Sequence, residues 1–364
     1  GGPTAWTLAL AGKDAILRGA ARTDKPVKLD ALSAHVTGRD GGMSIDEFTV
    51  AGAGGATGRV TGTVDTSADE GGLTLKINAA HTDGRMALRL WPEHIAPPAR
   101  EYLVDNLQGG LVDKVDITVD MSGSELAAAT RGEPMPDGAV HIDFAVSDAT
   151  LLVTEDAPPL SRGRVNGTIT GLTTTIRGVT ADIKMPDDRT LYITDGSFVI
   201  PKITPDTVTA QIGLKLGGGA DALVALLQTK MFKNLTGVEI DPASVKGNAD
   251  LRIDFPLNLK RIPELPDLPV SLTGTLNDLA VEKAFGKEKL ENGRFAVTYE
   301  RGGFTLKGDG RVLGSPLTLD LRQPKAGAPG EVNATLLLDE ALRARKGLPV
   351  APQITGTIPV RLTL

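Results

Sequence analysis

Paired carboxylates are the first candidates for chemistry in this chain. Asp187, Asp188 and Asp195 stand on either side of one expected strand, and two facing carboxyl groups could serve as acid and base in glycoside hydrolysis. Acidic residues are also common in the loops where strands end, and the spacing fits that role better. We therefore expect these three acids to be surface loop residues, and we assign no catalytic residue.

Metal binding is the second kind of chemistry to consider. The chain has 4 His and no Cys. His35, His81, His94 and His141 lack the i, i+4 spacing of a helical metal site, and no cluster of acids lies beside them. The sequence therefore predicts no metal site, and the lack of Cys excludes zinc ribbons, thiol nucleophiles and disulfides together.

Glycine-rich loops could hold a phosphate group if their spacing were suitable. The run 52–58 has the wrong spacing for a dinucleotide loop and is not followed by a helical pattern, and Gly308-Asp-Gly310 fails for the same reason. The chain also lacks a Gly-x-Ser-x-Gly nucleophile elbow and a Ser-x-x-Lys with its supporting motifs. We predict that the protein is not an enzyme and needs no cofactor.

Bulk composition narrows the function further. The 364 residues are 41% hydrophobic and 23% charged, which is typical of a folded chain. The net charge is -6 and Lys and Arg do not cluster, so the sequence does not predict nucleic-acid binding. Aromatic residues make up only 4% of the chain, so its apolar surfaces must be built from Leu, Val, Ile and Ala.

The dominant pattern along the chain is strict alternation of apolar and polar residues, which is the period of a strand with one dry and one wet face. It is clearest in residues 140–146, 208–216, 251–259 and 317–321. One-sided strands of this kind are typical of antiparallel sheets. Turn signals such as Asp40-Gly41-Gly42 recur at short intervals, so we expect an all-β fold in which hairpins follow one another.

Two segments depart from the alternation and predict helices. The first begins at Pro97-Pro98 and ends before Gly109-Gly110. The second is expected over residues 221–235, closed by Gly237. Four apolar side chains are spaced to lie on one side of the second helix: Leu223, Leu226, Leu227 and Met231. This helix could be a plug packed on the sheet or a lid across a groove, and we favour the plug.

An internal repeat has a period similar to the separation of the two expected helices. Residues 147–178 align without a gap on residues 277–308, with apolar positions and turn glycines in phase. An earlier copy aligns 261 residues before the last one, for example at Leu29 and at Gly41-Gly42. These alignments predict three β-groove repeats in one continuous elongated body, over residues 1–90, 91–220 and 221–364.

Both ends of the sequence lie inside strand-like segments. The chain starts with Trp6–Leu10 and stops with Val360–Leu364, and it has no apolar run of about 18 residues. We therefore expect a fragment of a longer protein, with any membrane anchor outside the fragment.

Two stretches of the chain resemble a known family. The run Trp91–Gly110 has a Trp-Pro, a helical Arg and an Asn-x-x-Gly-Gly end, and the segment 241–259 starts with Asp-Pro-Ala-Ser-Val-Lys-Gly. Both are similar to the AsmA-like envelope proteins, and most of all to the large YhdP type. The glycine-punctuated strands at 163–178 and 293–308 have the same style. The chain lacks the amino-terminal membrane anchor that is expected of full-length members.

This resemblance implies a fold and a function. The family is similar to bridge-like lipid transfer proteins, in which a long, strongly bent antiparallel β-sheet forms a repeating groove with a few short helices at the repeat seams. The implied function is to shield phospholipid acyl chains during transport between the inner and outer membranes of Gram-negative bacteria. The implied location is the periplasm, with a tether to the inner membrane outside this fragment. Outer-membrane or periplasmic proteins are further candidate partners.

An apolar sheet face has to be covered by something, and two helices cannot cover roughly twenty expected strands. Each buried lipid methylene contributes about 0.8 kcal/mol, so an aliphatic groove can hold an acyl chain without any polar contact. The predicted lining residues are the apolar members of the alternating strands: Val208, Ala210, Ile212, Leu214, Leu216, Leu251, Ile253, Phe255, Leu317, Leu319 and Leu321.

The alternation leaves two other interpretations open. A β-sandwich or β-solenoid that packs its apolar faces against protein would show the same pattern. The chain could also be a structural or assembly scaffold for outer-membrane or exported proteins, because the edges of its sheet could pair with strands of a client protein.

Overall fold

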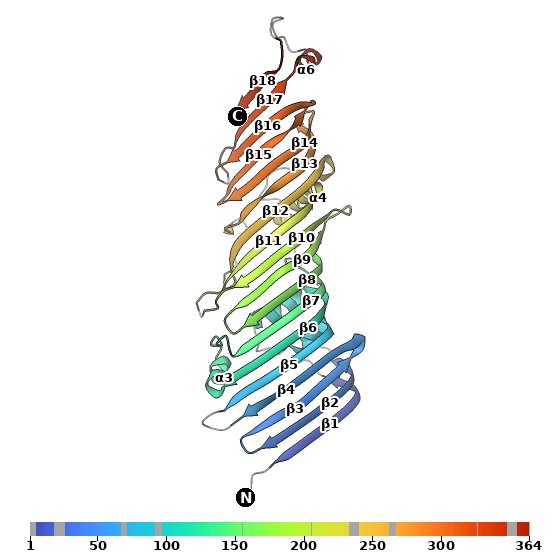
Figure 1. Ribbon diagram of the computed structural model, residues 1–364, viewed down its shortest axis with the longest axis vertical. Helices are drawn as coiled ribbons and strands as arrows, with labels where there is room; N and C mark the ends of the chain where they lie inside the picture. The colour runs from blue at the N-terminus through green and yellow to red at the C-terminus, as the bar shows by residue number, and fades with distance from the viewer. Residues whose placement is uncertain are drawn as a thin grey trace. The chain divides into compact units, whose positions relative to one another are not determined.

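The computed structural model describes residues 5–17, 26–66, 71–91, 97–154, 156–204, 206–232, 240–261, 267–325, 327–347 and 355–363. Over these residues the fold is all-β, with one 18-stranded antiparallel sheet that is not closed into a barrel and a few short helices (Figure 1). The predicted fold class is confirmed. The chain divides into two compact units, which are described separately below.

Unit 1 consists of Gly1–Asp182, Gly196–Gln211 and Leu257–Ile262. Its first eight strands form a meander in which each strand pairs antiparallel with the next. They are β1 (Trp6–Leu17), β2 (Val27–Arg39), β3 (Gly42–Gly52), β4 (Ala56–Asp65), β5 (Gly72–Asp83), β6 (Leu107–Ser122), β7 (Val140–Leu151) and β8 (Leu160–Thr170). Its helical elements are η1 (Ala53–Gly55), α1 (Gly84–Leu90), α2 (Pro97–Asn106) and α3 (Gly123–Thr130).

Unit 2 consists of Ile183–Asp195, Ile212–Pro256 and Pro263–Leu364. Its meander runs from β12 to β18. Beyond β12 the strands are β13 (Ser271–Phe285), β14 (Glu288–Glu300), β15 (Gly303–Val312), β16 (Ser315–Gln323), β17 (Glu331–Leu338) and β18 (Ile358–Thr363). Its helical elements are α4 (Ala220–Leu227), η2 (Pro242–Ser244) and α6 (Glu340–Arg345). Four strands have residues in both units: β9 (Thr174–Lys184), β10 (Thr190–Ile200), β11 (Thr209–Gly219) and β12 (Val245–Asn258).

The strands bend at bulges that occupy matching places in the repeat. Asp148 in β7 and Asp278 in β13 both have a φ of 52°, and Arg162 in β8 and Asn292 in β14 have φ of 51° and 50°. A left-handed residue inside a strand inserts one unpaired position and bends the strand. Each of these two pairs is separated by the 130 residues of the sequence repeat, so the repeat is also a repeat of backbone geometry.

The strand register repeats with the bulges. In the β7–β8 pair, Ala149 lies opposite Gly163 between two shifts of register. In the β13–β14 pair, Leu279 lies opposite Gly293, again between two shifts. Both partners are 130 residues further along the chain. The alignment of 147–178 with 277–308 therefore pairs residues that have the same place in the sheet.

The helices recur with a period of six strands. In the described chain, α1 follows β5, α4 follows β11 and α6 follows β17. Asp14 in β1 has the same φ of 52° as Asp148 in β7 and Asp278 in β13, which are also six strands apart. The predicted repeat boundaries after residues 90 and 220 lie at the end of α1 and at the first residue of α4.

The first predicted helix is confirmed as α2, but its predicted stop signal is wrong. Strand β6 begins directly at Leu107, so Gly109 and Gly110 lie inside a strand. Gly110 has a φ of 150°, and a Cβ on it would lie 3.1 Å from the Cα of Ala149. Gly110 therefore allows a close approach of two strands, which is the other common reason for glycine in a β-sheet.

The second predicted helix is shorter than expected. Helix α4 ends at Leu227, a turn follows at residues 228–229, and residues 230–232 are helical again. The last three residues of the predicted helix and Gly237 lie outside the described residues.

Three short helices were not predicted: α1, α3 and α6. Helix α3 starts with a capping box, in which Ser122 and Glu125 bond to each other's backbone. The Ser-x-x-Glu spacing is visible in the sequence and is a known helix-start signal. Asp83 and Asp339 cap α1 and α6 in a similar way.

Gly308, on the apolar face of unit 2, provides a test of how closely neighbouring strands pack at glycines. A Cβ on Gly308 would press on the carbonyl oxygen of Arg294 and lie 2.8 Å from the Cα of Phe295. We expect Gly308→Ala to lower the free energy of unfolding by about 1–3 kcal/mol, the usual cost of overpacking. Gly330→Ala is the matched control, because its Cβ would meet only the carbonyl oxygen of Arg322 at 3.6 Å. The free energy of unfolding of both variants would be measured by chemical denaturation. An equal loss of stability in the two variants would contradict close packing at Gly308.

Candidate functional site: an apolar sheet face

An unbroken row of apolar side chains crosses eight strands of unit 1. Residues that lie opposite each other in antiparallel strands project from the same face of the sheet. The register places the following residues in one line, called the central row below: Leu10, Ala34, Phe48, Val60, Ile77, Ile117, Ile142 and Ile169. Leu10 is 53% exposed, and the other members are half-buried. The central row is therefore a line of apolar side chains that protein covers only in part.

Three further rows flank the central row on the same face, and none contains a polar side chain. The first is Trp6, Gly38, Met43, Val64, Leu73 and Met121. The second is Leu8, Val36, Ile45, Gly62, Leu75, Val119 and Val140. The third is Gly12, Leu32, Val50, Gly58, Ala79, Val115, Phe144 and Gly167. Together the four rows make a broad aliphatic surface.

The opposite face of the same strands carries mainly polar side chains. One row there consists of Ser33, Thr49, Arg59, Asn78, Asp116, Asp143 and Thr168. Neighbours in this row bond to one another. The hydroxyls of Ser33 and Thr49 are 2.7 Å apart, and Thr168 donates to Asp143 at 2.6 Å. The polar face needs no cover because water and these bonds satisfy its side chains.

Other parts of the protein cover the apolar face of unit 1 near the ends of its strands. Beside α3, Met121, Ala139 and Val140 form a buried cluster, and Met135 and Ile142 pack against it. At the start of β6, Arg85 of α1 donates to the carbonyl oxygens of Val104 and Leu107 at 3.0 and 2.8 Å. These contacts dock the helices at strand ends and leave the middle of the central row half-buried.

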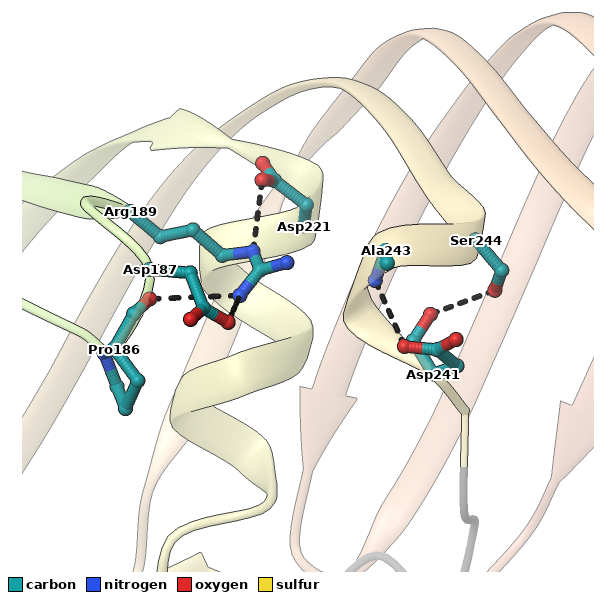
Figure 2. A network of polar contacts seen from close by, with 7 residues as sticks. All are labelled: Pro186, Asp187, Arg189, Asp221, Asp241, Ala243 and Ser244. Atoms are coloured by element: carbon teal, nitrogen blue, oxygen red, sulfur yellow. Dashed lines mark hydrogen bonds and ion pairs between the residues drawn. The ribbon is translucent and has the colours of Figure 1, made fainter.

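In unit 2, protein closes part of the apolar face. One row there consists of Ala249, Leu276, Phe295, Gly308, Leu319, Ala334 and Leu362. Phe295 is 1% exposed and belongs to a buried cluster that also includes Leu290, Leu319 and Ala220 of α4. The neighbouring strands arch over α4 in Figure 2. The same kind of surface is therefore packed against a helix here.

Ten of the predicted lining residues lie in β11, β12 and β16, with different degrees of cover, and Val208 lies in an isolated bridge before β11. Leu251 lies in one row with Leu321, by way of Gly274, Val297 and Leu306. Five of the predicted residues are buried: Ala210, Leu216, Leu251, Leu317 and Leu319. The others are half-buried: Val208, Ile212, Leu214, Ile253, Phe255 and Leu321. Val208 and Ala210 belong to unit 1, and the rest belong to unit 2.

Helix α4 does not use the predicted side chains to contact the unit 2 core. Leu223, Leu226, Leu227 and Met231 are all half-buried. Its buried residues are Ala220 and Ala222, and the buried cluster contains Ala220 with Val224 packed against it. A helix that is apolar on all sides gives no periodic signal for the face that will meet the sheet.

The central row was missed by the sequence prediction, although its signal was present. Residues 73–79 alternate Leu-Thr-Leu-Lys-Ile-Asn-Ala, and residues 115–121 alternate Val-Asp-Ile-Thr-Val-Asp-Met. What the sequence does not contain is the register that aligns Ile77 with Ile117.

The acids and histidines considered for chemistry have surface roles. Asp187 and Asp188 lie in the turn before β10, and Asp187 pairs with Arg189 at 2.8 Å. Asp195 pairs with Lys215 at 3.4 Å. Asp187 and Asp188 are therefore turn residues as expected, whereas the expected loop position of Asp195 is wrong because this residue lies inside β10.

Two histidines sit beside carboxylates on the polar face. The ring nitrogens of His35 and His141 lie 2.9 Å from carboxylate oxygens of Asp46 and Asp143. His94 lies outside the described residues. Within the residues that the structure describes, no group of three His, Cys, Asp or Glu could hold a metal ion.

Comparison with known proteins finds no match to this chain among family models, curated proteins or solved structures. None of the helices in the described part of the chain combines the length and the apolarity that a membrane crossing requires.

Hydrogen bonds on the polar face should make stability depend on pH. The hydroxyl of Thr168 and the ring of His141 lower the pKa of Asp143 below its ordinary value of 3.8. A lowered pKa in the folded state adds stability that is present above about pH 4 and is lost as the pH falls through the folded value. We expect Thr168→Val to reduce this loss, as measured by urea denaturation at pH 7 and pH 3. An equal loss in wild type and variant would show that the hydrogen bond does not control the titration of Asp143.

Proposed function

We propose that the apolar sheet face binds phospholipid acyl chains, and that the chain belongs to an AsmA-like, periplasmic protein that carries lipid between the inner and outer membranes. The head groups would stay in water at the mouth of the groove. In this proposal the protein solvates lipid and does no chemistry.

The observation that supports this proposal is the central row with its flanking rows. They form a broad aliphatic surface on one side of a sheet whose other side is polar. Such a surface has to be covered, and its half-buried state in unit 1 leaves it open to a ligand. An acyl chain that lies along the row would meet only aliphatic and aromatic side chains from one strand to the next.

Acyl chains suit this surface better than a folded partner with polar side chains. Apart from the indole N–H of Trp6, the side chains of these rows offer no donor or acceptor to a polar group, and a polar group buried without a hydrogen bond is costly. Each methylene placed in the row contributes about 0.8 kcal/mol. Binding of this kind depends on chain length and is insensitive to the head group.

A scaffold function is the second candidate, and one observation favours it. Strand β1 exposes Trp6, Leu8 and Leu10, and β18 exposes Val360 and Leu362. Strands with exposed apolar side chains can pair with a strand of another protein. Peptide cross-links to these two strands, with no lipid on the protein, would favour the scaffold.

Adjacent residues on opposite faces of β6 provide a matched test. Ile117 lies in the central row, and Thr118 is exposed on the polar face opposite Lys76. The protein would be incubated with phosphatidylethanolamine and phosphatidylglycerol liposomes and separated from them, and its lipid would be counted by mass spectrometry. We expect Ile117→Asp to lower the bound lipid at least about tenfold, because a loss of 1.4 kcal/mol already has that effect.

Thr118→Asp makes the same chemical change on the wet face and should leave the bound lipid unchanged. Circular dichroism would establish that both variants fold. Equal lipid on both variants would contradict binding at the apolar face, and wild type without lipid would favour the scaffold.

A further inference from the structure

Helix α4 is seated on the apolar face of unit 2. Its sequence is Ala-Asp-Ala-Leu-Val-Ala-Leu-Leu, with Asp221 as the only charged residue. Ala220 and Val224, one turn apart, pack against the cluster that holds Leu317 and Leu319. Helix α4 therefore covers the part of the apolar face around this cluster, where Leu317 and Leu319 are buried.

The leucines of α4 are less covered than its alanines. Leu223, Leu226 and Leu227 are half-buried, whereas Ala220 and Ala222 are buried. Val224 is also half-buried and packs against the buried cluster. The contact of α4 with this cluster is therefore made by Ala220 and Val224, and none of its leucines is fully buried.

Three consecutive glycines precede α4. Gly217, Gly218 and Gly219 are the last residues of β11, and α4 begins at the next residue. Gly218 has a φ of 149° and approaches Leu191 closely, whereas a Cβ on Gly217 would meet only the carbonyl oxygen of Ala249 at 3.9 Å. Hinges are a few residues at the ends of elements that absorb large changes in φ and ψ, and this run has the required freedom.

One arginine ties the start of α4 to the turn between β9 and β10. Nε of Arg189 donates to Asp221 at 3.1 Å, and Nη1 donates to Asp187 at 2.8 Å (Figure 2). The Arg189 side chain is 16% exposed, but that of Asp221 is 36% exposed. Water reaches this ion pair from the side of Asp221, which weakens it, so the contact can act as a latch.

We propose that α4 is a gate for the apolar face of unit 2. It swings about Gly217–Gly219, is released when Arg189 lets go of Asp221, and in its open position uncovers the row at Leu319 for a phospholipid acyl chain. This inference rests on the proposed function, because it assigns to α4 the control of where lipid can bind.

The lack of Cys in the chain makes the gate measurable with a single thiol. Val224→Cys places that thiol on the seated side of α4, and its rate of maleimide labelling reports opening of the gate. We expect Arg189→Met and Asp221→Asn each to raise this rate at least about fivefold, and Gly217→Ala to lower it. Leu223→Cys is the control, because Val224 and not Leu223 makes the contact with the buried cluster, and the thiol of this control should be labelled at one rate in all backgrounds. Thermal melting would establish that each variant folds.

A labelling rate at Val224→Cys that is equal in all backgrounds would overturn the gate and make α4 a fixed part of the core. Lipid bound per protein after incubation with the same liposomes should rise in Arg189→Met, and an unchanged value would also overturn the gate. Failure of the proposed function would look different. Wild type would then carry no lipid, while the labelling rates would still differ between backgrounds.

Discussion

The one-sided strand is the constraint on which the rest of this structure depends. Each strand of unit 1 alternates apolar and polar side chains, so the sheet has a dry face and a wet face. Hydrogen bonds between neighbouring strands satisfy the backbone, but they cannot cover the dry face. The two units meet this requirement differently. Unit 2 packs α4 on its face, and unit 1 leaves the central row half-buried.

The bulges and the helices give this sheet its period. Asp148 and Asp278 hold left-handed conformations that Asp tolerates better than most residues. Gly163 and Gly293 face the bulged strands where a side chain would press on the neighbouring backbone. A helix then follows every sixth strand of the described meander. The same combination of bulge, close strand contact and short helix therefore recurs at regular intervals along the chain.

The sequence was informative where one physical cause dominates. Alternation predicted the all-β antiparallel fold, because the burial of one face determines the residue type at every second position. The alignment of 147–178 with 277–308 found the repeated register, because bulges and close strand contacts restrict residue type as strongly as burial does.

Sequence patterns were misleading where one residue type serves two different structural purposes. Gly109 and Gly110 were interpreted as a helix stop, but they lie in β6, where Gly110 allows close packing of a neighbouring strand. The leucines of α4 that were expected on one side are all half-buried, and the buried cluster contains Ala220 with Val224 packed against it. Register was not predictable from one strand at a time, so the central row emerged only from the pairing of β1 to β8.

Native mass spectrometry of the wild-type chain, purified without detergent, tests the central claim most directly. The account predicts masses shifted by bound phospholipid, and lipid extraction should give mixed head groups and mixed chain lengths. A mass equal to that of the protein alone, before and after incubation with liposomes, would contradict it. The apolar face would then have to be covered by protein.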